Sequence, residues 1–384
     1  MRLISRAVAT LFMVVALPGL LWAQDSDDPS VQIESDNTAF GGTSAEFLQF
    51  GSGARGMALG GSFSTIVDDV NALYYNPAGL TAMQGPEVAL TLMPYFADTD
   101  YYWAGLAFPF SDGDFGLGFF LGHFGFGNQP IYTEADPDGL SGETYGVNET
   151  VAGISFAHAF IDRFSAGLTL KFINDDLATG ALGGASATAM ALDFGVNFHS
   201  ELGNRPIRLA FVVQNLGGSL AHSGEALRFR DVNYSEADQT VPDQRVDPPP
   251  AILVSDAFPL PRLFRVGLNY DVISNESTTL ALMTEFIESN NTNAAFGFGS
   301  EFRWQGLDTP VGVALRASYQ TQPDASESFS TGAIETSKGT DGLGLGGGLF
   351  YRFGGTYRLQ FDYAYKNYGV LGSANAFSVT FGVD

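Results

Sequence analysis

The sequence predicts an all-β membrane protein, namely a 14-stranded antiparallel transmembrane β-barrel with a small N-terminal partly helical hatch. Three observations predict this fold. Apolar side chains alternate with small or polar ones in about fourteen segments, connection lengths differ between the two ends of these segments, and mean hydropathy is close to zero at +0.07. A sheet of so many strands does not readily stay open. In a bilayer it must close, so that every backbone polar group is paired.

The alternation is clearest in residues 357–366, where aromatic and apolar side chains take every second position. A period of two indicates a β-strand with two unlike faces. We expect the apolar face to contact lipid and the other face to line the lumen. The same pattern predicts strands over 87–96, 100–110, 114–124, 148–160, 163–174, 187–199, 205–216, 261–270, 277–287, 293–303, 310–320, 341–352, 356–365 and 374–383.

Connection lengths give an independent indication of a membrane barrel. The connections after the even-numbered predicted strands are all short, whereas long ones follow the third, fifth, seventh and eleventh strands, over 125–147, 175–186, 217–260 and 321–340. Short turns at one end and long loops at the other are typical of outer-membrane barrels. An even number of strands also places both termini on the side of the short turns.

The N-terminus resembles a secretory signal. Arg2 and Arg6 precede an apolar core, and Ala23 is a plausible last residue before cleavage. The alternative is an uncleaved membrane anchor. We predict a signal peptide over 1–23, a disordered leader over 24–40, a hatch over 41–84 and an outer-membrane β-barrel over 85–384. The predicted location is the bacterial outer membrane, reached by signal-directed export.

The predicted hatch differs in pattern from the rest of the chain. Apolar residues at helical spacing, such as Val70 and Leu73, predict a helix within 68–83 that stops at Asn76-Pro77, because proline disfavours helical geometry in the preceding residue. Gly79 is predicted to permit a left-handed turn into the first strand.

The strand parity also predicts which charged side chains enter the lumen, and the two signs nearly cancel. We expect such mixed charges to cross-link the interior of a narrow barrel. The candidates are Lys171, Arg208, Arg265, Arg303, Arg316 and Arg358, with Asp193, Glu285, Glu301 and Asp362.

Composition and motifs argue against several other functions. A formal net charge of –24 opposes nucleic acid as a partner. Residues 51–56 fit a dinucleotide fingerprint but lack the βαβ unit that it requires, so no cofactor is predicted. The four histidines are not placed to build a Ser-His-acid site, and we do not expect an enzyme. Asp136 and Asp138 lack a full set of calcium ligands, so no metal is predicted.

Two stretches carry a family resemblance. Residues 47–61 (FLQFGSGARGMALGG) and 68–80 (DDVNALYYNPAGL) resemble the patterns GARxxGMGG and DDxxAxYxNPAGL of the PorV/PorQ family of bacterial outer-membrane proteins, with Leu59 where glycine is commoner. That family is similar to the FadL-type transporters, which are 14-stranded barrels with an N-terminal hatch. Residues 213–217 (VQNLG) and 361–365 (FDYAY) extend the match. The chain departs from it at the C-terminus, where Asp384 stands in place of the usual aromatic residue.

The resemblance implies two functions. One is a FadL-like conduit for hydrophobic or amphipathic small molecules. The other is a PorV-like accessory of a secretion and surface-attachment system, which would bind exported proteins through its outer loops, chiefly 217–260. The partners expected are therefore outer-membrane lipid and either a hydrophobic small molecule or an exported protein. The hatch is a plug or a gate, and its candidate residues are Arg55, Asp68, Asp69, Asn76, Pro77 and Gly79.

Overall fold

The computed structural model describes residues 41–96, 98–134, 136–229, 251–306, 309–321 and 342–383. The predicted signal peptide and leader lie outside these residues, as do Asp384 and most of the predicted loop 321–340. The described chain belongs to one compact unit.

Fourteen strands form a closed antiparallel barrel in which β1 pairs with β18. All fourteen predicted strands are present, with ends shifted by a few residues. They are β1 (Glu87–Pro94), β2 (Thr99–Phe110), β3 (Phe115–Pro130), β4 (Thr144–Ile161), β5 (Phe164–Gly180), β6 (Ser186–Leu202), β7 (Arg205–Gly217), β12 (Leu263–Ser274), β13 (Thr278–Ser289), β14 (Ala295–Gln305), β15 (Val311–Gln320), β16 (Leu343–Phe353), β17 (Tyr357–Asn367) and β18 (Ser373–Val383).

The outer face of the barrel is apolar and the inner face is not. On β6, Met190, Leu192 and Phe194 are exposed on the outside, while Asp193 and Asn197 between them are buried inside. The other strands repeat this pattern. An apolar belt around a closed sheet is stable only in hydrocarbon, so the barrel spans a membrane. None of the helices in the described residues is long and apolar enough to cross a membrane.

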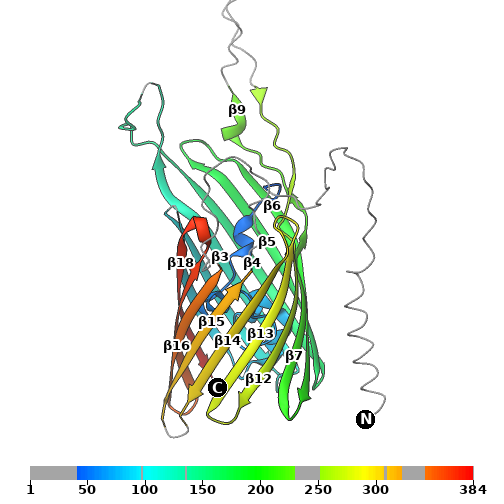
Figure 1. Ribbon diagram of the computed structural model, residues 1–384. Helices are drawn as coiled ribbons and strands as arrows, with labels where there is room; N and C mark the ends of the chain where they lie inside the picture. The colour runs from blue at the N-terminus through cyan, green and yellow to red at the C-terminus, as the bar shows by residue number, and fades with distance from the viewer. Residues whose placement is uncertain are drawn as a thin grey trace, which may run out of the picture. The chain divides into compact units, whose positions relative to one another are not determined.

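The two ends of the barrel differ. One end, here called the turn end, carries tight connections such as 162–163 and 203–204. The other, the loop end, carries the long connections and lies at the top of Figure 1, with β9 beyond the rim. The long connection between β7 and β12 contains short paired elements: β8 (Ser219–Leu220) with β11 (Phe258–Pro259), and β9 (Arg228–Phe229) with β10 (Ala251–Ile252), besides η3 (Glu225–Leu227).

Two predicted loops are partly wrong. The loop predicted over 125–147 is strand up to Pro130 and again from Thr144, and the loop predicted over 175–186 is strand up to Gly180. These strand ends are rich in glycine and polar residues. The hydrogen-bond ladder continues there after the apolar alternation stops, because a strand beyond the bilayer needs no lipid-facing side chains.

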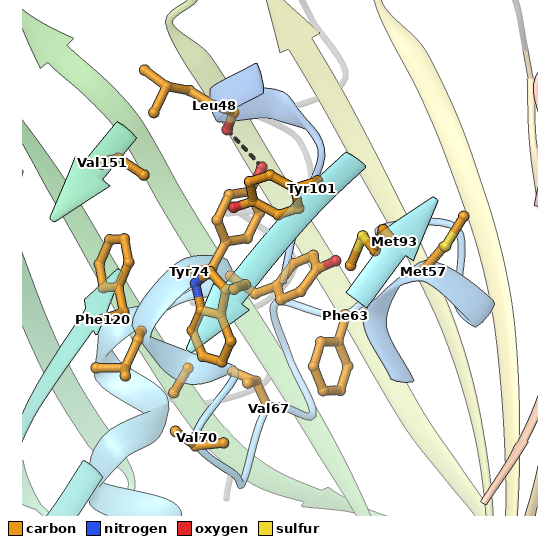
Figure 2. Packing of buried hydrophobic residues seen from close by; sticks show 14 of the residues in the cluster. Leu48, Met57, Phe63, Val67, Val70, Tyr74, Met93, Tyr101, Phe120 and Val151 are labelled. Carbon is orange, nitrogen blue, oxygen red and sulfur yellow. Dashed lines mark hydrogen bonds between the residues drawn. The ribbon is translucent and has the colours of Figure 1, made fainter. Parts of the chain in front are cut away.

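Residues 41–84, here called the inner segment, run inside the barrel from the loop end to the turn end (blue in Figure 1). The segment contains η1 (Glu46–Gln49), α2 (Ala54–Ala58), α3 (Ala72–Tyr75) and η2 (Pro77–Ala82). A further 3-10 turn, η5 (Gly369–Leu371), precedes β18. Figure 2 shows Tyr74 of the inner segment beside Tyr101 of β2, in a buried hydrophobic cluster that also includes Phe63, Val67 and Phe120.

The helix predicted within 68–83 is present as α3, and it stops at Asn76-Pro77 as predicted, because Asn76 adopts an extended conformation (φ –166°, ψ 104°) before Pro77; a 3-10 helix follows. One detail of the predicted hatch is corrected, namely the turn at Gly79. Gly79 does not have a positive φ. Packing requires a glycine at position 79 instead, since a Cβ atom there would lie 2.4 Å from the carbonyl oxygen of Val67.

Candidate functional site

A buried ion-pair cluster joins the inner segment to the barrel wall. The guanidinium of Arg55 on α2 donates to Glu301 on β14 through Nε (2.9 Å) and Nη2 (2.8 Å). Its Nη1 contacts Asp68 at 2.5 Å and Asp69 at 2.8 Å. Arg55 and Glu301 are almost fully buried. Paired guanidinium and carboxylate groups satisfy one another's hydrogen bonds at such a site, as a buried charge requires.

The cluster continues along the wall. Arg316 on β15 donates to Glu301 and to Asp362 on β17, both at 2.6 Å. Four charged side chains therefore link α2 to three strands. Their acidic and basic partners lie up to 246 residues apart in sequence.

Asp68 is the most accessible member of the cluster, with 44% of its side chain exposed. Its second oxygen contacts Arg303 Nη1 at 3.3 Å. Burial acts to raise the pKa of the Asp68 carboxyl, but the guanidinium groups of Arg55 and Arg303 outweigh that effect and lower the pKa to about 2. Asp68 is thus ionised at neutral pH and shared between the inner segment and β14.

Asn76-Pro77 fits into a part of the wall that lacks side chains. The Asn76 amide donates to Asn197 Oδ1 (2.8 Å) and to the Ser64 carbonyl (3.0 Å), and its oxygen accepts from the Ala78 N–H. A Cβ atom on Gly195 would lie 2.1 Å from Asn76 Oδ1, and one on Gly167 would lie 2.5 Å from the Pro77 carbonyl carbon. These two wall glycines make room for the motif.

The stretch 213–217 holds the inner segment from another side. Gln214 donates to the Tyr74 carbonyl oxygen at 2.5 Å. Asn215 has φ +60°, which is uncommon for a residue other than glycine, at a register shift between β6 and β7. Its side chain accepts from Lys171 Nζ (2.7 Å), and Lys171 forms an ion pair with Asp193 at 2.6 Å.

The other predicted lumen charges are paired as well. Arg265 contacts Glu285 at 3.1 Å, and Glu285 accepts from the N–H and hydroxyl of Ser64. Arg208 is bidentate to Asp271, and Arg358 contacts Glu87. Sequence reasoning missed Asp271 and Glu87. Glu87 lies on the inward parity of β1, whereas Asp271 falls one residue beyond the predicted strand 261–270.

A cavity of about 300 Å³ lies on the loop-end side of the inner segment. Aromatic side chains and two cations line it: Phe50, Tyr74, Tyr75, Tyr95, Tyr368, Arg265 and Lys366. Burial raises the pKa of Tyr74 to about 12, so its hydroxyl stays protonated and donates to the Leu48 carbonyl oxygen at 2.9 Å, as Figure 2 shows. Lys366 Nζ donates to Gln320 at 3.0 Å and lies 5.1 Å from the Tyr368 ring centroid.

A second cavity of about 190 Å³ lies at the turn end. Polar side chains dominate its lining, including Asp68, Gln84 and Arg303. The two cavities share no lining residue, and the inner segment contributes to both linings. The inner segment therefore separates a chamber rich in aromatic residues from a polar chamber.

The side chains of His123, His158, His222 and Asp136 make contacts with other residues of the fold. His158 and His123 lie on the outer face, where His158 stacks on Phe115 and His123 on Tyr102. Asp136 accepts from the backbone N–H groups of Ser141 and Leu140, and these bonds lower the pKa of its carboxyl. Sequence reasoning did not foresee that His222, in the longest connection, reaches Asp175 on β5.

The barrel is similar in fold to solved transport proteins. The toluene transporter TbuX of Ralstonia pickettii matches with a TM-score of 0.53 and 12% identity, over 87% of this chain and 97% of that chain. A TodX deltaS2S3 mutant, described as a monoaromatic hydrocarbon channel, matches with a TM-score of 0.50 and 12% identity, over 87% of this chain and 98% of that chain. No protein-family model and no curated protein matches the sequence. The likeness concerns the fold, and the PorV/PorQ resemblance stays a prediction.

Proposed function

We propose that this protein is an outer-membrane conduit for hydrophobic or amphipathic small molecules, in which residues 41–84 act as a hatch. The observation that carries the proposal is the position of the inner segment between two cavities in a lipid-spanning barrel. The fold likeness to TbuX and to the TodX mutant adds support, since both are described as passing aromatic hydrocarbons. The loop end would face the cell exterior and the turn end the periplasm.

The chemistry of the loop-end cavity agrees with such a ligand. Tyrosine and phenylalanine rings offer apolar contact area, and a few hydroxyl and cationic groups can orient a polar end. A volume of about 300 Å³ suits a small molecule at the lower end of the usual pocket range. The ligand would pass the hatch only if contacts such as Arg55–Glu301 and Gln214–Tyr74 are exchanged or broken.

Uptake by proteoliposomes tests the proposal directly. Liposomes that contain the mature protein should take up toluene and an amphipathic aromatic solute faster than empty liposomes, and deletion of residues 41–84 should change the rate. If uptake equals that of empty liposomes with and without the deletion, the conduit is excluded.

A disulfide lock separates a moving hatch from a fixed plug. The chain has no cysteine, so an engineered pair is unambiguous. A Cβ atom on Gly297 of β14 would lie 3.4 Å from the Cβ of Ser62, close to the separation that a disulfide needs. In the Ser62→Cys/Gly297→Cys variant, uptake should stop under oxidation and return with a reductant. The single Ser62→Cys variant is the control, and uptake that continues through the oxidised pair would mean that the hatch does not move.

A PorV-like role in secretion is the second candidate. The observation that favours it is a set of apolar side chains on loop-end connections that project away from the barrel, such as Leu140 and Val254, which is 91% exposed. Exposed apolar side chains of this kind suit a protein partner. Replacement of Leu253 and Val254 by serine should reduce the recovery of exported proteins in a pull-down from a secreting cell. Recovery of no exported protein by the unmodified protein would exclude this role.

A further inference from the structure

The connection after β7 runs along the loop end of β6, where the Gly218 N–H donates to the Met190 carbonyl oxygen and the Ala226 N–H to the Gly184 carbonyl oxygen. Residues 218–228, here called the strap, follow the end of β7 at Gly217. Leu220 on β8 is fully buried in the hydrophobic cluster of the barrel interior. Ser223 and Ser186 exchange two backbone hydrogen bonds of 3.0 Å, which attaches the strap to the start of β6.

The wall under the strap carries only small side chains. The inward positions at the loop end of β6 are Ala185, Ala187, Ala189 and Ala191, and all are buried. β8 contacts β6 beside these small side chains. The strap is therefore packed onto the rim through backbone and small apolar contacts.

One charged contact fixes the middle of the strap. His222 Nε2 lies 3.2 Å from Asp175 Oδ2 on β5, and the two side chains are only 9% and 3% exposed. Neither His222 Nε2 nor Asp175 Oδ1 has a hydrogen-bond partner among the described residues. The contact is an ion pair only when the imidazole is protonated, and the unperturbed imidazole titrates between about pH 5 and 8.

The groups around this pair are acidic. Glu149 on β4 lies directly opposite Asp175 in the strand register, and its buried Oε2 has no hydrogen-bond partner among the described residues. Asp176 follows on β5, and Glu46 of η1 is close enough to repel Glu149. In the described part of the chain, neither lysine nor arginine pairs with Asp175 or Glu149. A protonated His222 thus provides the positive charge that these carboxylates face.

We propose that the His222–Asp175 contact is a proton-operated latch that holds the strap against β6 at the loop-end rim of the barrel. The latch is closed when the imidazole is protonated. When the imidazole loses its proton, the carboxylate of Asp175 loses the positive charge that faces it, and the strap detaches from β6. The attachment of the strap therefore weakens as the pH of the medium rises. This latch goes beyond the proposed conduit, and its test does not depend on transport.

Hydrogen exchange of the intact mature protein in detergent micelles tests the latch. The amides of Ser223 and Ser186 report strap attachment, and a peptide from β15 serves as the internal reference. After correction for the intrinsic pH dependence of exchange, protection of the strap should fall by about tenfold between about pH 5.5 and about pH 8, the ratio expected for losing one hydrogen bond to a charged group. In the His222→Gln variant, protection of the strap should be low at both pH values.

Two further variants complete the test. Asp175→Asn keeps the shape of the side chain and removes its charge, so it should also abolish the pH dependence. His123→Gln changes a histidine on the outer face and should leave the pH dependence intact. The latch is excluded if strap protection in the unmodified protein does not change with pH, or if the change persists in His222→Gln. His222 lies in a connection outside the barrel ladder, so its replacement should not prevent folding.

Discussion

Arg55 and Glu301 form a bidentate ion pair across 246 residues of sequence, with N···O distances of 2.9 and 2.8 Å. The pair joins a helix inside the barrel to a strand of its wall. Both side chains are buried, so neither charge has water to replace its partner. A single substitution at Glu301 therefore removes a buried charged attachment of the inner segment.

Replacement of Glu301 by glutamine should detach the inner segment locally. Arg55 and Arg316 would both lose a carboxylate partner, and breaking a buried ion pair from one side costs about 3–5 kcal/mol. Hydrogen exchange of residues 53–60 should accelerate accordingly. Glu288→Gln, on the exposed face of β13, is the matched control and should have no effect. Equal exchange in both variants would contradict the anchoring role of Glu301.

Introduction of a methyl group at Gly195 should displace Asn76. The added Cβ would lie 2.1 Å from Asn76 Oδ1, and overpacking of this kind costs about 1–3 kcal/mol. Limited proteolysis should cut the inner segment of Gly195→Ala faster than that of the unmodified protein. Gly127→Ala adds a methyl group on β3 where no heavy atom lies within 4 Å, and it should not change the cleavage rate. Resistance equal to that control would mean that Asn76 does not need the space.

The attachment of Asp68 should withstand mild acid. Because the pKa of Asp68 is lowered to about 2, its stabilising contribution is fully present above the ordinary carboxyl value and is lost as the pH falls through about 2. Hydrogen exchange around Asp68, corrected for its intrinsic pH dependence, should stay constant from neutral pH to about pH 4. The Asp68→Asn variant should exchange faster at every pH in this range. A rise in exchange of the unmodified protein near neutral pH would contradict this assignment.

The closed barrel should resist detergent at room temperature. Every barrel strand is paired on both sides, so there is no free edge at which unfolding can begin. In sodium dodecyl sulfate, unheated protein should migrate faster on a gel than boiled protein. Identical migration of the two samples, or solubility of the mature protein without detergent, would be incompatible with a membrane barrel.

Most of the wall was predictable from local pattern. In strands such as β6 and β17, apolar and polar side chains alternate with a period of two. One face of the strand contacts hydrocarbon and the other does not, so every second residue is apolar. The predicted strand ends and helical turns are less accurate where the chain no longer contacts lipid. Residues 125–130 and 144–147 are strand beyond the apolar belt, and the mixed helical turns around Asn76 depend on contacts with Gly167 and Gly195 in the wall.

The site was predictable in part. Parity identified inward charges such as Arg265 and Glu285, but it did not identify their partners, and it missed Glu87, Asp271 and the contact of His222 with Asp175. His222 belongs to a connection without periodicity, so its position follows from the packing of Leu220 and from the pairing of Ser223 with Ser186.

The sequence by itself determined the number and the faces of the strands, because lipid contact is a local requirement that each strand meets alone. Only the tertiary structure decided which charges pair, where the inner segment divides the lumen, and that the strap lies along β6. These features depend on closure of the barrel, which brings residues from opposite ends of the chain, such as Arg55 and Asp362, into one buried cluster.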